Sequence, residues 1–288
     1  MSVQFTKLEA TGNDFVVVDE DVIDAVEPAL PVSVRKALCA RHTGVGADGV
    51  LTILHARPEA RALGAVYRMH ITNPDGSVPE MCGNGLRCVA RHLAETGRIA
   101  REIDVVIDTD AGCRTVRVAP DAGSVTIDMG RPDLDSQRQF PERLDRSPLS
   151  HVAGLKATSV SMGNPHVVIE ADELPSPEDA TRRGSAIELD RVLVPERTNV
   201  EWVVDRHDGT TDVDAIVWER GAGLTQACGT GACAVVAALV RHGRRQPGTT
   251  TVHLPGGPLS ITVTALDAPV LMTGPVRRVF AGVFEGER

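Results

Sequence analysis

Two short loops carry the residues best suited to chemistry. Cys82 begins the sequence Cys-Gly-Asn-Gly and Cys228 begins Cys-Gly-Thr-Gly, and each loop precedes a stretch with the apolar spacing of a helix. Glycines let the backbone turn tightly, and the first turn of a helix has N–H groups without internal acceptors, so both loops suit an anion. We expect each helix terminus to lower the thiol pKa from about 8.5 and to bind a substrate carboxylate. The N–H groups concerned belong to Gly83, Asn84, Gly229 and Thr230.

Such a cysteine pair fits the inversion of an amino-acid α-carbon. One thiolate can remove the α-proton while a thiol on the opposite face returns one, and the reverse reaction exchanges the two roles. The carbanion is poorly stabilised without a cofactor, so the protein must supply a dry site and positive helix ends. The pattern predicts a two-base racemase or epimerase with Cys82 and Cys228 as its catalytic residues.

The chain is also internally duplicated. Shifting it by 146 positions lays residues 82–85 over residues 228–231. The identities continue downstream as Val89 with Val235, Leu93 with Leu239, Gly97 with Gly243, and Arg98 with Arg244. A repeat of roughly 150 residues implies two like-folded domains related by an approximate two-fold axis, with equivalent loops facing each other across the interdomain cleft.

Short β-rich runs alternate with a few helices in both halves. We expect strands at 3–8, 15–19, 50–55, 65–72, 104–107, 116–118 and 124–129. We expect helices at 33–42 with a Ser33 cap, at 86–95, at 232–242, and from Ser176 with Pro177 as its first residue. The polar, proline-bearing stretch 131–150 predicts a domain boundary near its start and a hinge there.

The composition of the chain limits the classes of partner that we expect it to bind. The formal net charge of −9 argues against a protein whose main partner is a nucleic acid. No apolar run approaches the roughly 18 residues of a membrane span, and the N-terminus carries no secretory signal pattern, so we expect a cytoplasmic protein that acts on a small molecule. The remaining cysteines are expected to be buried small hydrophobes rather than metal or disulfide pairs. They are Cys39, Cys88, Cys113 and Cys233.

Eight ordered motifs resemble those of the diaminopimelate epimerase family over nearly the whole chain. They lie at residues 12–15, 44–48, 73–77, 81–85, 163–166, 197–200, 219–223 and 227–231. The resemblance implies an isomerase that converts LL-2,6-diaminopimelate to the meso form in lysine and peptidoglycan precursor biosynthesis, as a homodimer, without pyridoxal phosphate, metal or nucleotide. It also implies an α/β protein of the α+β type, with two homologous domains related by pseudo-two-fold symmetry. Each domain would wrap a mostly antiparallel sheet around a helix, with the active site in the interdomain cleft. Residues 1–130 plus 275–288 would form the half with Cys82, and 131–274 the half with Cys228.

The resemblance also assigns substrate contacts. Carried over by motif, a set of polar side chains would bind the substrate, largely at its distal end, with Glu219 near the reacting centre and His166 in support. The set comprises Asn13, Asn73, Asn164, Asn199 and Arg220. From the residues alone, the asparagines could equally be turn residues, Glu219 and Arg220 an exposed pair, and His166 a structural histidine.

Departures and rival functions remain. Gly49 stands where many family members have glutamine, and Leu224 where an acidic residue is common, which bears on substrate affinity. Another racemase of this fold, for proline, hydroxyproline or a basic amino acid, is one alternative, although proline enzymes typically carry histidine where this chain has Asn84. A non-catalytic thiol/disulfide protein is the alternative from another class.

Overall fold

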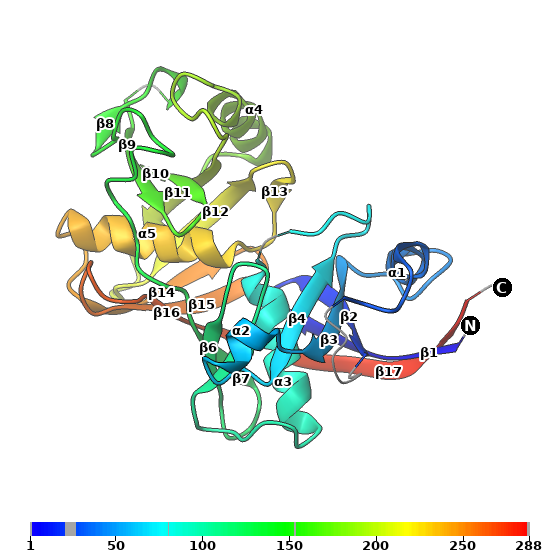
Figure 1. The fold of residues 1–288 in the computed structure, drawn as a ribbon. Helices are drawn as coiled ribbons and strands as arrows, with labels where there is room; N and C mark the ends of the chain where they lie inside the picture. Colours follow the sequence, from blue (N-terminus) through cyan, green and yellow to red (C-terminus); the bar gives the residue numbers. More distant parts are fainter. Residues whose placement is uncertain (1, 21–26, 80, 153, 287–288) are drawn as a thin grey trace. The chain divides into compact units, whose positions relative to one another are not determined.

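The computed structural model describes residues 2–20, 27–79, 81–152 and 154–286, and the chain forms two compact units (Figure 1). Unit 1 comprises Met1–Ile127 and Thr273–Arg288, and unit 2 comprises Asp128–Met272. The domains expected from the sequence, 1–130 plus 275–288 and 131–274, stay a prediction.

Unit 1 is a mixed sheet that wraps a helix. Its elements are β1 (Ser2–Ala10), β2 (Asn13–Asp19), α1 (Val32–Cys39), β3 (Gly49–His55), α2 (Pro58–Arg61), β4 (Tyr67–Thr72), α3 (Gly83–Glu95), β5 (Val105–Asp108), β6 (Arg114–Val118), β7 (Ser124–Asp128) and β17 (Arg277–Glu285). The pairs β2–β3 and β4–β5 are parallel, and β17–β1, β1–β2, β3–β4, β5–β6 and β6–β7 are antiparallel. Helix α3 packs against β1 to β4 and β6, so it forms the centre of the unit.

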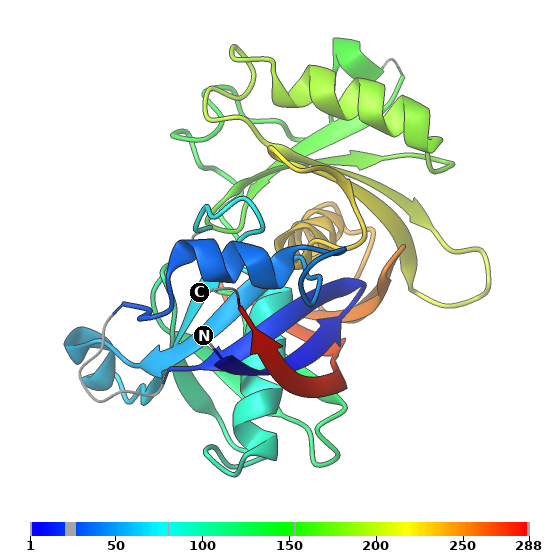
Figure 2. The same ribbon diagram turned by 90° about the vertical axis from the view of Figure 1, so that its right-hand side faces the viewer.

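Unit 2 repeats this arrangement. Its elements are β8 (Ser147–Pro148), the 3₁₀ helix η1 (Ser150–Val152), β9 (Lys156–Ser161), β10 (Pro165–Glu170), α4 (Pro177–Glu188), β11 (Asn199–Asp205), β12 (Val213–Glu219), β13 (Gly223–Thr225), α5 (Gly229–Arg241), β14 (Gly248–Leu254), β15 (Gly257–Val263) and β16 (Leu271–Pro275). The pairs β10–β11 and β12–β14 are parallel, and β9–β10, β11–β12 and β14–β15 are antiparallel. Figure 2 shows α4 lying across one face of these strands, and in Figure 1 α5 covers the other.

The two halves therefore share one topology. Helices α3 and α5 each have 13 residues and occupy corresponding positions of the sequence repeat. The strands β2 to β6 have the same order and directions as β10, β11, β12, β14 and β15. The expected α+β class, with two similar halves that each wrap a mostly antiparallel sheet around a helix, is confirmed.

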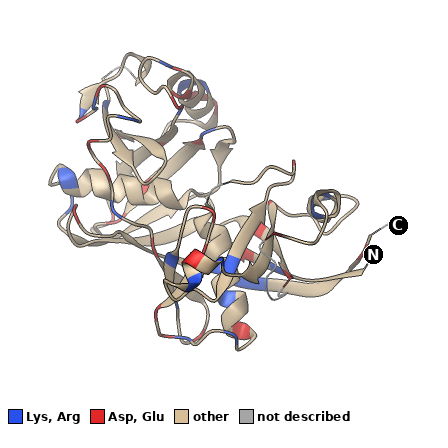
Figure 3. Cartoon of the chain, in the orientation of Figure 1, with Lys and Arg blue, Asp and Glu red and all other residues tan. Residues whose placement is uncertain are grey.

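Strand β3 and helix α5 have apolar sequences because they are buried. Strand β3 is buried along nearly its whole length and reads as an almost continuous apolar run, because helices cover both of its faces. Helix α5 is buried all round apart from its ends, and in Figure 3 its ribbon is almost free of the colours of charged residues. Across the described ranges, no helix has both the length and the apolar character that a membrane crossing requires.

The expected strands are present, with ends shifted by at most two residues. Helix α4 begins at Pro177 as expected, and the Ser176 hydroxyl oxygen accepts the N–H of Asp179 at 3.2 Å. The stretch 131–150 is less of a free linker than its composition indicates, because its apolar residues belong to the core of unit 2. These residues are Phe140, Leu144 and Leu149.

Helix α1 corrects one expectation. We expected 33–42 with Ser33 as the cap, but the N-cap position is Pro31, which makes no side-chain capping bond. The Pro31 carbonyl instead accepts the N–H groups of the first turn, among them that of Arg35 at 3.1 Å. The helix ends early because Ala40 adopts an extended conformation, with φ −63° and ψ 117°.

Helices α3 and α5 begin three residues earlier than the apolar spacing predicted. They start at Gly83 and Gly229 rather than at Leu86 and Ala232. Glycine has a low helix propensity, so the pattern left the glycine-bearing turn outside. The preceding cysteine stabilises that turn, because its carbonyl accepts the N–H of Leu86 or Ala232, at 2.9 and 3.0 Å respectively.

The core of unit 2 gives a stability prediction. Trp202 is fully buried in the core cluster of this unit, so Trp202→Ala should cost about 3–5 kcal/mol of unfolding free energy. The matched control is Val192→Ala, since Val192 is 89 % exposed and should change stability by less than about 0.5 kcal/mol. Urea unfolding followed by far-UV circular dichroism measures both, and equal effects would contradict the assignment of Trp202 to the core.

Candidate active site

Both loop cysteines are the N-caps of their helices. Each has an extended backbone conformation, and its sulfur accepts the N–H of the glycine three residues later. The N–H of Gly85 lies 3.3 Å from Cys82 Sγ, and that of Gly231 lies 3.4 Å from Cys228 Sγ. Each sulfur thus occupies the place of a capping oxygen at the positive end of a helix.

Strand and helix approach each other closely at Gly85 and Gly231, the glycines whose N–H groups donate to the two cysteines. A Cβ at Gly85 would lie 2.9 Å from Leu51 Cδ2, and a Cβ at Gly231 would lie 2.7 Å from Glu201 Oε1. Leu51 lies on β3 and Glu201 on β11, the equivalent strand of the other unit. Glycine at this position therefore lets the start of each helix lie directly against its sheet.

In unit 2, a chain of hydrogen bonds leads to Cys228. His166 Nδ1 lies 2.7 Å from Glu201 Oε1, and both side chains are fully buried. His166 Nε2 lies 3.0 Å from Asn164 Oδ1, and Asn164 Nδ2 donates to Thr230 Oγ1 at 3.3 Å. Thr230 Oγ1 lies 3.4 Å from Cys228 Sγ. The structure thus brings four of the predicted site residues together and adds Glu201, which the motifs did not single out.

The electrostatics around Cys228 are opposite to our expectation. Burial raises the pKa of the Cys228 thiol well above its usual value, and the carboxylates of Glu219 and Glu201 raise it further. The hydrogen bonds from Thr230 and Gly231 oppose this rise but do not outweigh it. The prediction of a lowered pKa is therefore wrong for Cys228, because it considered the helix terminus and neither the burial of the thiol nor the carboxylates.

Glu219 lies beside this thiol. Burial raises the pKa of its carboxyl group, the nearby charge of Glu201 adds to the rise, and hydrogen bonds with Thr225 and Cys228 lower it. Its Oε1 accepts the hydroxyl of Thr225. Glu219 therefore lies next to the sulfur of Cys228, as expected for a residue near the reacting centre, and not in an exposed pair.

Unit 1 surrounds the loop of Cys82 with different groups. Arg87 is fully buried, and its guanidinium donates to Asn84 Oδ1 at 2.8 Å and to the hydroxyl of Thr11. Asn84 Nδ2 donates in turn to Asn13 Oδ1, while Asn13 Nδ2 donates to Asp48 Oδ2 at 3.2 Å. A buried cation thus anchors the first turn of α3, where unit 2 has buried carboxylates.

The other predicted residues are held by local contacts. Asn73 Nδ2 donates to Ser77 Oγ at 3.0 Å within a turn. Asn199 is buried; its Nδ2 donates to the carbonyl of Pro165 and its Oδ1 accepts the N–H of Arg220, both at 2.9 Å. Among the described residues, the Arg220 guanidinium is bound to one main-chain carbonyl, that of Glu196 at 3.2 Å. Asn199 therefore serves local backbone, and Asn73 binds a neighbouring hydroxyl within its turn.

The remaining N–H groups of the two loops lie in the first helical turns. Gly83, Asn84, Gly229 and Thr230 follow the capping cysteines, where a helix provides no internal acceptors. Each loop therefore retains the anion-binding character expected from its sequence.

Sequence reasoning missed Glu201 and Arg87. Both carry a charge inside an otherwise apolar stretch, Glu201 in the strand sequence NVEWVV and Arg87 in the helix sequence LRCVAR. A charge in such a place is buried only when it is paired or strongly hydrogen-bonded, and that was the available signal.

The six cysteines, all within the described ranges, are free. Cys39, Cys88 and Cys233 are buried as expected, and burial raises the pKa of Cys39 to about 11. Cys113 is only partly buried, against expectation, because it packs at the margin of a small satellite cluster. Among the described residues, no group of three or more His, Cys, Asp or Glu side chains is placed to bind a metal ion.

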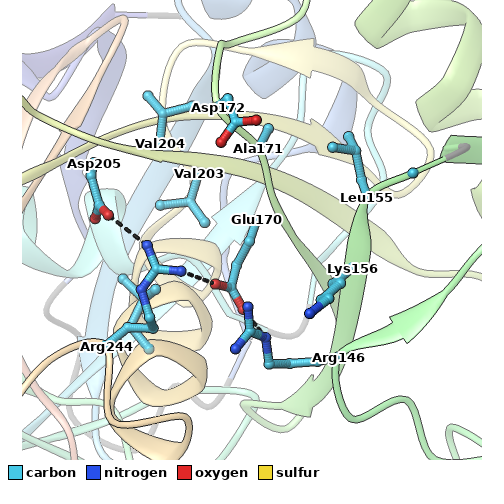
Figure 4. Close-up of a pocket in the computed structure, with 12 residues that line it drawn as sticks. Arg146, Leu155, Lys156, Glu170, Ala171, Asp172, Val203, Val204, Asp205 and Arg244 are labelled. Atoms are coloured by element: carbon cyan, nitrogen blue, oxygen red, sulfur yellow. Dashed lines mark hydrogen bonds and ion pairs between the residues drawn. The ribbon is translucent and has the colours of Figure 1, made fainter.

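A cavity of about 170 Å³ in unit 2 is a separate feature (Figure 4). Its centre is Glu170, which pairs with Arg146 at 3.3 Å and Arg244 at 3.1 Å, and Arg244 also pairs with Asp205 at 2.7 Å. None of the predicted site residues lines it, and Arg146, Glu170, Arg244 and Asp205 among its charged groups are paired with one another. We therefore do not assign the active site to this cavity.

Known proteins resemble the chain over nearly its full length. The family model of diaminopimelate epimerase matches residues 5–134 and 158–279. A diaminopimelate epimerase of Cyanothece sp. strain PCC 7425 is 42 % identical over 294 residues, covering 98 % of this chain and 100 % of that protein. The corresponding protein of Desulfitobacterium hafniense is 41 % identical over 291 residues, covering 98 % of each.

Solved structures share the fold at low sequence identity. A probable proline racemase from Agrobacterium radiobacter matches with a TM-score of 0.70 at 15 % identity, covering 97 % of this chain and 92 % of its own. A hydroxyproline epimerase from Agrobacterium vitis matches with a TM-score of 0.68 at 17 % identity, covering 98 % and 90 %.

Fold and relatives together define an enzyme, an isomerase of the epimerase class. The full-length match is specific within that class. The chain belongs to the diaminopimelate epimerase family.

The raised pKa of Cys228 gives a prediction for its reactivity. In the folded protein, iodoacetamide should modify Cys228 only at higher pH than in the denatured chain, because the thiolate is the reactive form. Glu219→Gln removes the neighbouring charge and should move this pH dependence to lower pH. Peptide mass spectrometry after timed alkylation measures both.

The control for this experiment is Asp208→Asn, which removes an exposed carboxylate between β11 and β12 of the same unit. It should leave the pH dependence of Cys228 alkylation unchanged. A shift to higher pH in Glu219→Gln would contradict the assigned cause.

Proposed function

We propose that this protein converts LL-2,6-diaminopimelate to meso-diaminopimelate, with Cys82 and Cys228 as its two bases. The observation that carries the proposal is the equivalent placement of both cysteines as sulfur N-caps in two halves of one topology. Full-length relatives named diaminopimelate epimerase support the substrate.

The proton transfers follow from this pairing. One cysteine, as thiolate, takes the α-proton of the substrate, and the other, as thiol, donates its proton to the opposite face of the carbanion. Each turnover therefore leaves the two cysteines with exchanged protonation states. The substrate α-carboxylate binds the free N–H groups of the helix termini, which stabilise the negative charge that develops as the proton leaves.

The surroundings of Cys228 favour this residue as the one that holds the proton first. Because burial raises the pKa of its thiol, and the carboxylates of Glu219 and Glu201 add to the rise, Cys228 enters the reaction as the thiol. Cys82 then removes the α-proton of the isomer that binds to the resting enzyme. The thiol of Cys228 also donates a hydrogen bond to Glu219, which keeps the proton in place until it is transferred.

The distal amino-acid end of diaminopimelate is a zwitterion and needs both donors and acceptors. Arg220 is suited to its carboxylate because, within the described ranges, its guanidinium makes one bond, to a carbonyl oxygen. Asn199 acts indirectly, since both ends of its amide are used to fix Pro165 and Arg220. Asn13, Asn73 and Asn164 complete the proposed set. Gly49 begins β3 as Asn199 begins β11, so the first half has no equivalent of this amide.

Isotope exchange tests the function. In deuterated water, the reduced protein should exchange α-hydrogens of LL-diaminopimelate and form the meso product, as followed by NMR. Cys82→Ala and Cys228→Ala should each lower the epimerisation rate by about 10³-fold, because either change removes one of two required proton carriers. Cys113→Ala is the matched control and should retain full activity.

Other outcomes distinguish the rival functions. Exchange of proline, hydroxyproline, lysine or arginine without exchange of diaminopimelate would reassign the substrate within the same fold. Retained activity in both cysteine variants would exclude the two-base assignment. Activity that requires oxidation of the thiols, and is lost with reductant, would favour the disulfide function.

We also propose that the protein works as a cytoplasmic homodimer. Strand β17 supports the dimer, because it presents apolar side chains to solvent at one edge of unit 1. Val279 and Val283 of this strand are 54 % and 52 % exposed. Such a face is typical of a surface that a second copy covers.

The dimer has its own test. Val279→Glu combined with Val283→Glu should convert the dimer to a monomer in light scattering after gel filtration, because the change places charges in the interface. Val192→Glu, at another exposed valine, should leave the molecular mass unchanged. A wild-type protein with the mass of one chain would contradict the dimer.

A further inference from the structure

The two halves differ most sharply at one buried pair. In the parallel ladder of unit 2, His166 of β10 lies opposite Asn199, and two residues along β11 is Glu201. In the equivalent ladder of unit 1, Phe15 of β2 lies opposite Gly49, and two residues along β3 is Leu51. The apolar pair Phe15 and Leu51 thus occupies the place that His166 and Glu201 occupy in unit 2.

Packing alone does not explain the polar pair. Burying a carboxylate is costly unless its oxygens are hydrogen-bonded, and unit 1 shows that this topology accepts two apolar side chains at these positions. Glu201 is fully buried, and its Oε2 has no hydrogen-bond partner among the described residues. Its Oε1 is used by His166. A residue so poorly suited to stability is expected to serve the site.

The direction of the hydrogen bonds shows what Glu201 can do. Both ring nitrogens of His166 face acceptor oxygens, Nδ1 that of the Glu201 carboxylate and Nε2 that of the Asn164 amide. The ring donates to both only as an imidazolium, and the buried carboxylate of Glu201 is the counter-ion that stabilises this form. The amide of Asn164 therefore turns its Nδ2 toward Thr230 Oγ1. With this lone pair occupied, the hydroxyl hydrogen of Thr230 is free to point at Cys228 Sγ.

In unit 1 the equivalent side chains are hydrogen-bonded in the opposite direction. Phe15 offers no hydrogen bond to Asn13, the asparagine two residues before it, and Asn13 Oδ1 instead accepts from Asn84 Nδ2. Asn84 stands where unit 2 has Thr230, so the bond between the equivalent side chains runs in the opposite direction. In unit 1 the Asp48 carboxylate fixes the Asn13 amide by accepting from its Nδ2, whereas in unit 2 His166 fixes the Asn164 amide by binding its Oδ1.

We propose that Glu201 is a positioning residue, which acts through His166, Asn164 and Thr230 to direct a hydroxyl donor at Cys228 Sγ. This inference rests on the proposed two-base function. The donor assists Cys228 whenever its sulfur carries negative charge, after it has released its proton to the carbanion. Cys82 has no such hydroxyl in its loop, so the assistance is specific to one direction of proton transfer.

A double-mutant cycle tests the action through Thr230. Thr230→Val removes the hydroxyl but keeps the shape of the side chain. Glu201→Gln removes the charge that fixes the direction of the hydrogen bonds from His166 to Thr230. Each single variant should lower kcat for epimerisation about tenfold with little change in KM, the effect of one lost hydrogen bond. The double variant should be no slower than either single variant, because both remove the same interaction.

A buried carboxylate that takes no part in the hydrogen bonds leading to Cys228 provides the matched control. Glu188 is also buried in unit 2, where it accepts from Trp218 and from the N–H of Gly221. Any effect of Glu188→Gln should add to that of Thr230→Val. If Glu201→Gln destabilises the fold, the double change His166→Phe with Glu201→Leu copies the pair of unit 1 and should restore the melting temperature while kcat stays low.

A second readout does not depend on the substrate. Thr230→Val should move the pH dependence of Cys228 alkylation to higher pH, because a hydrogen bond to the thiolate is lost, and this shift should be smaller when Glu201 is already replaced by Gln. The comparison between the two backgrounds cancels the direct effect of the Glu201 charge on the thiol. Wild-type kcat in Glu201→Gln, or effects of Glu201→Gln and Thr230→Val that simply multiply, would overturn the positioning role. Failure of the wild-type protein to epimerise diaminopimelate, with coupled alkylation shifts intact, would instead overturn only the proposed substrate.

Discussion

The site depends on one contact made twice, the hydrogen bond from a helix N–H to a cysteine sulfur. The first turn of a helix leaves N–H groups unsatisfied, and a side chain at the N-cap can accept one of them. Here the acceptors are Cys82 and Cys228, so the remaining N–H groups stay available beside each sulfur. Each glycine-bearing loop then lies against a central strand, where a larger residue at Gly85 or Gly231 would collide.

The same backbone supports two electrostatic environments. Around Cys228 the buried carboxylates of Glu219 and Glu201 favour the thiol, whereas the loop of Cys82 is anchored by the buried guanidinium of Arg87. A two-base reaction needs one proton acceptor and one proton donor at its start. Two halves with identical side chains would provide neither preference, so the divergence within the duplicated scaffold serves the chemistry that we propose.

Local contacts also divide the predicted polar residues by role. Asn199 and Asn73 satisfy backbone or neighbouring groups, as turn residues do, while in the described part of the chain one carbonyl oxygen is the partner of the Arg220 guanidinium. The motifs therefore include residues that hold their neighbours in place as well as the residues that we propose to contact the substrate. His166 belongs to the second kind in the described structure, since it is fully buried.

The sequence by itself determined the duplication, the two capping cysteines, the fold class and the family, because these follow from residue types at fixed spacing. It misplaced the starts of α3 and α5, since glycine lowers helix propensity and only the capping bonds restore it. Tertiary structure alone decided the protonation of Cys228 and the role of Glu201. A pKa depends on burial and on charges brought close in space, and Cys228 is buried beside the carboxylates of Glu219 and Glu201, which come from the paired strands β12 and β11.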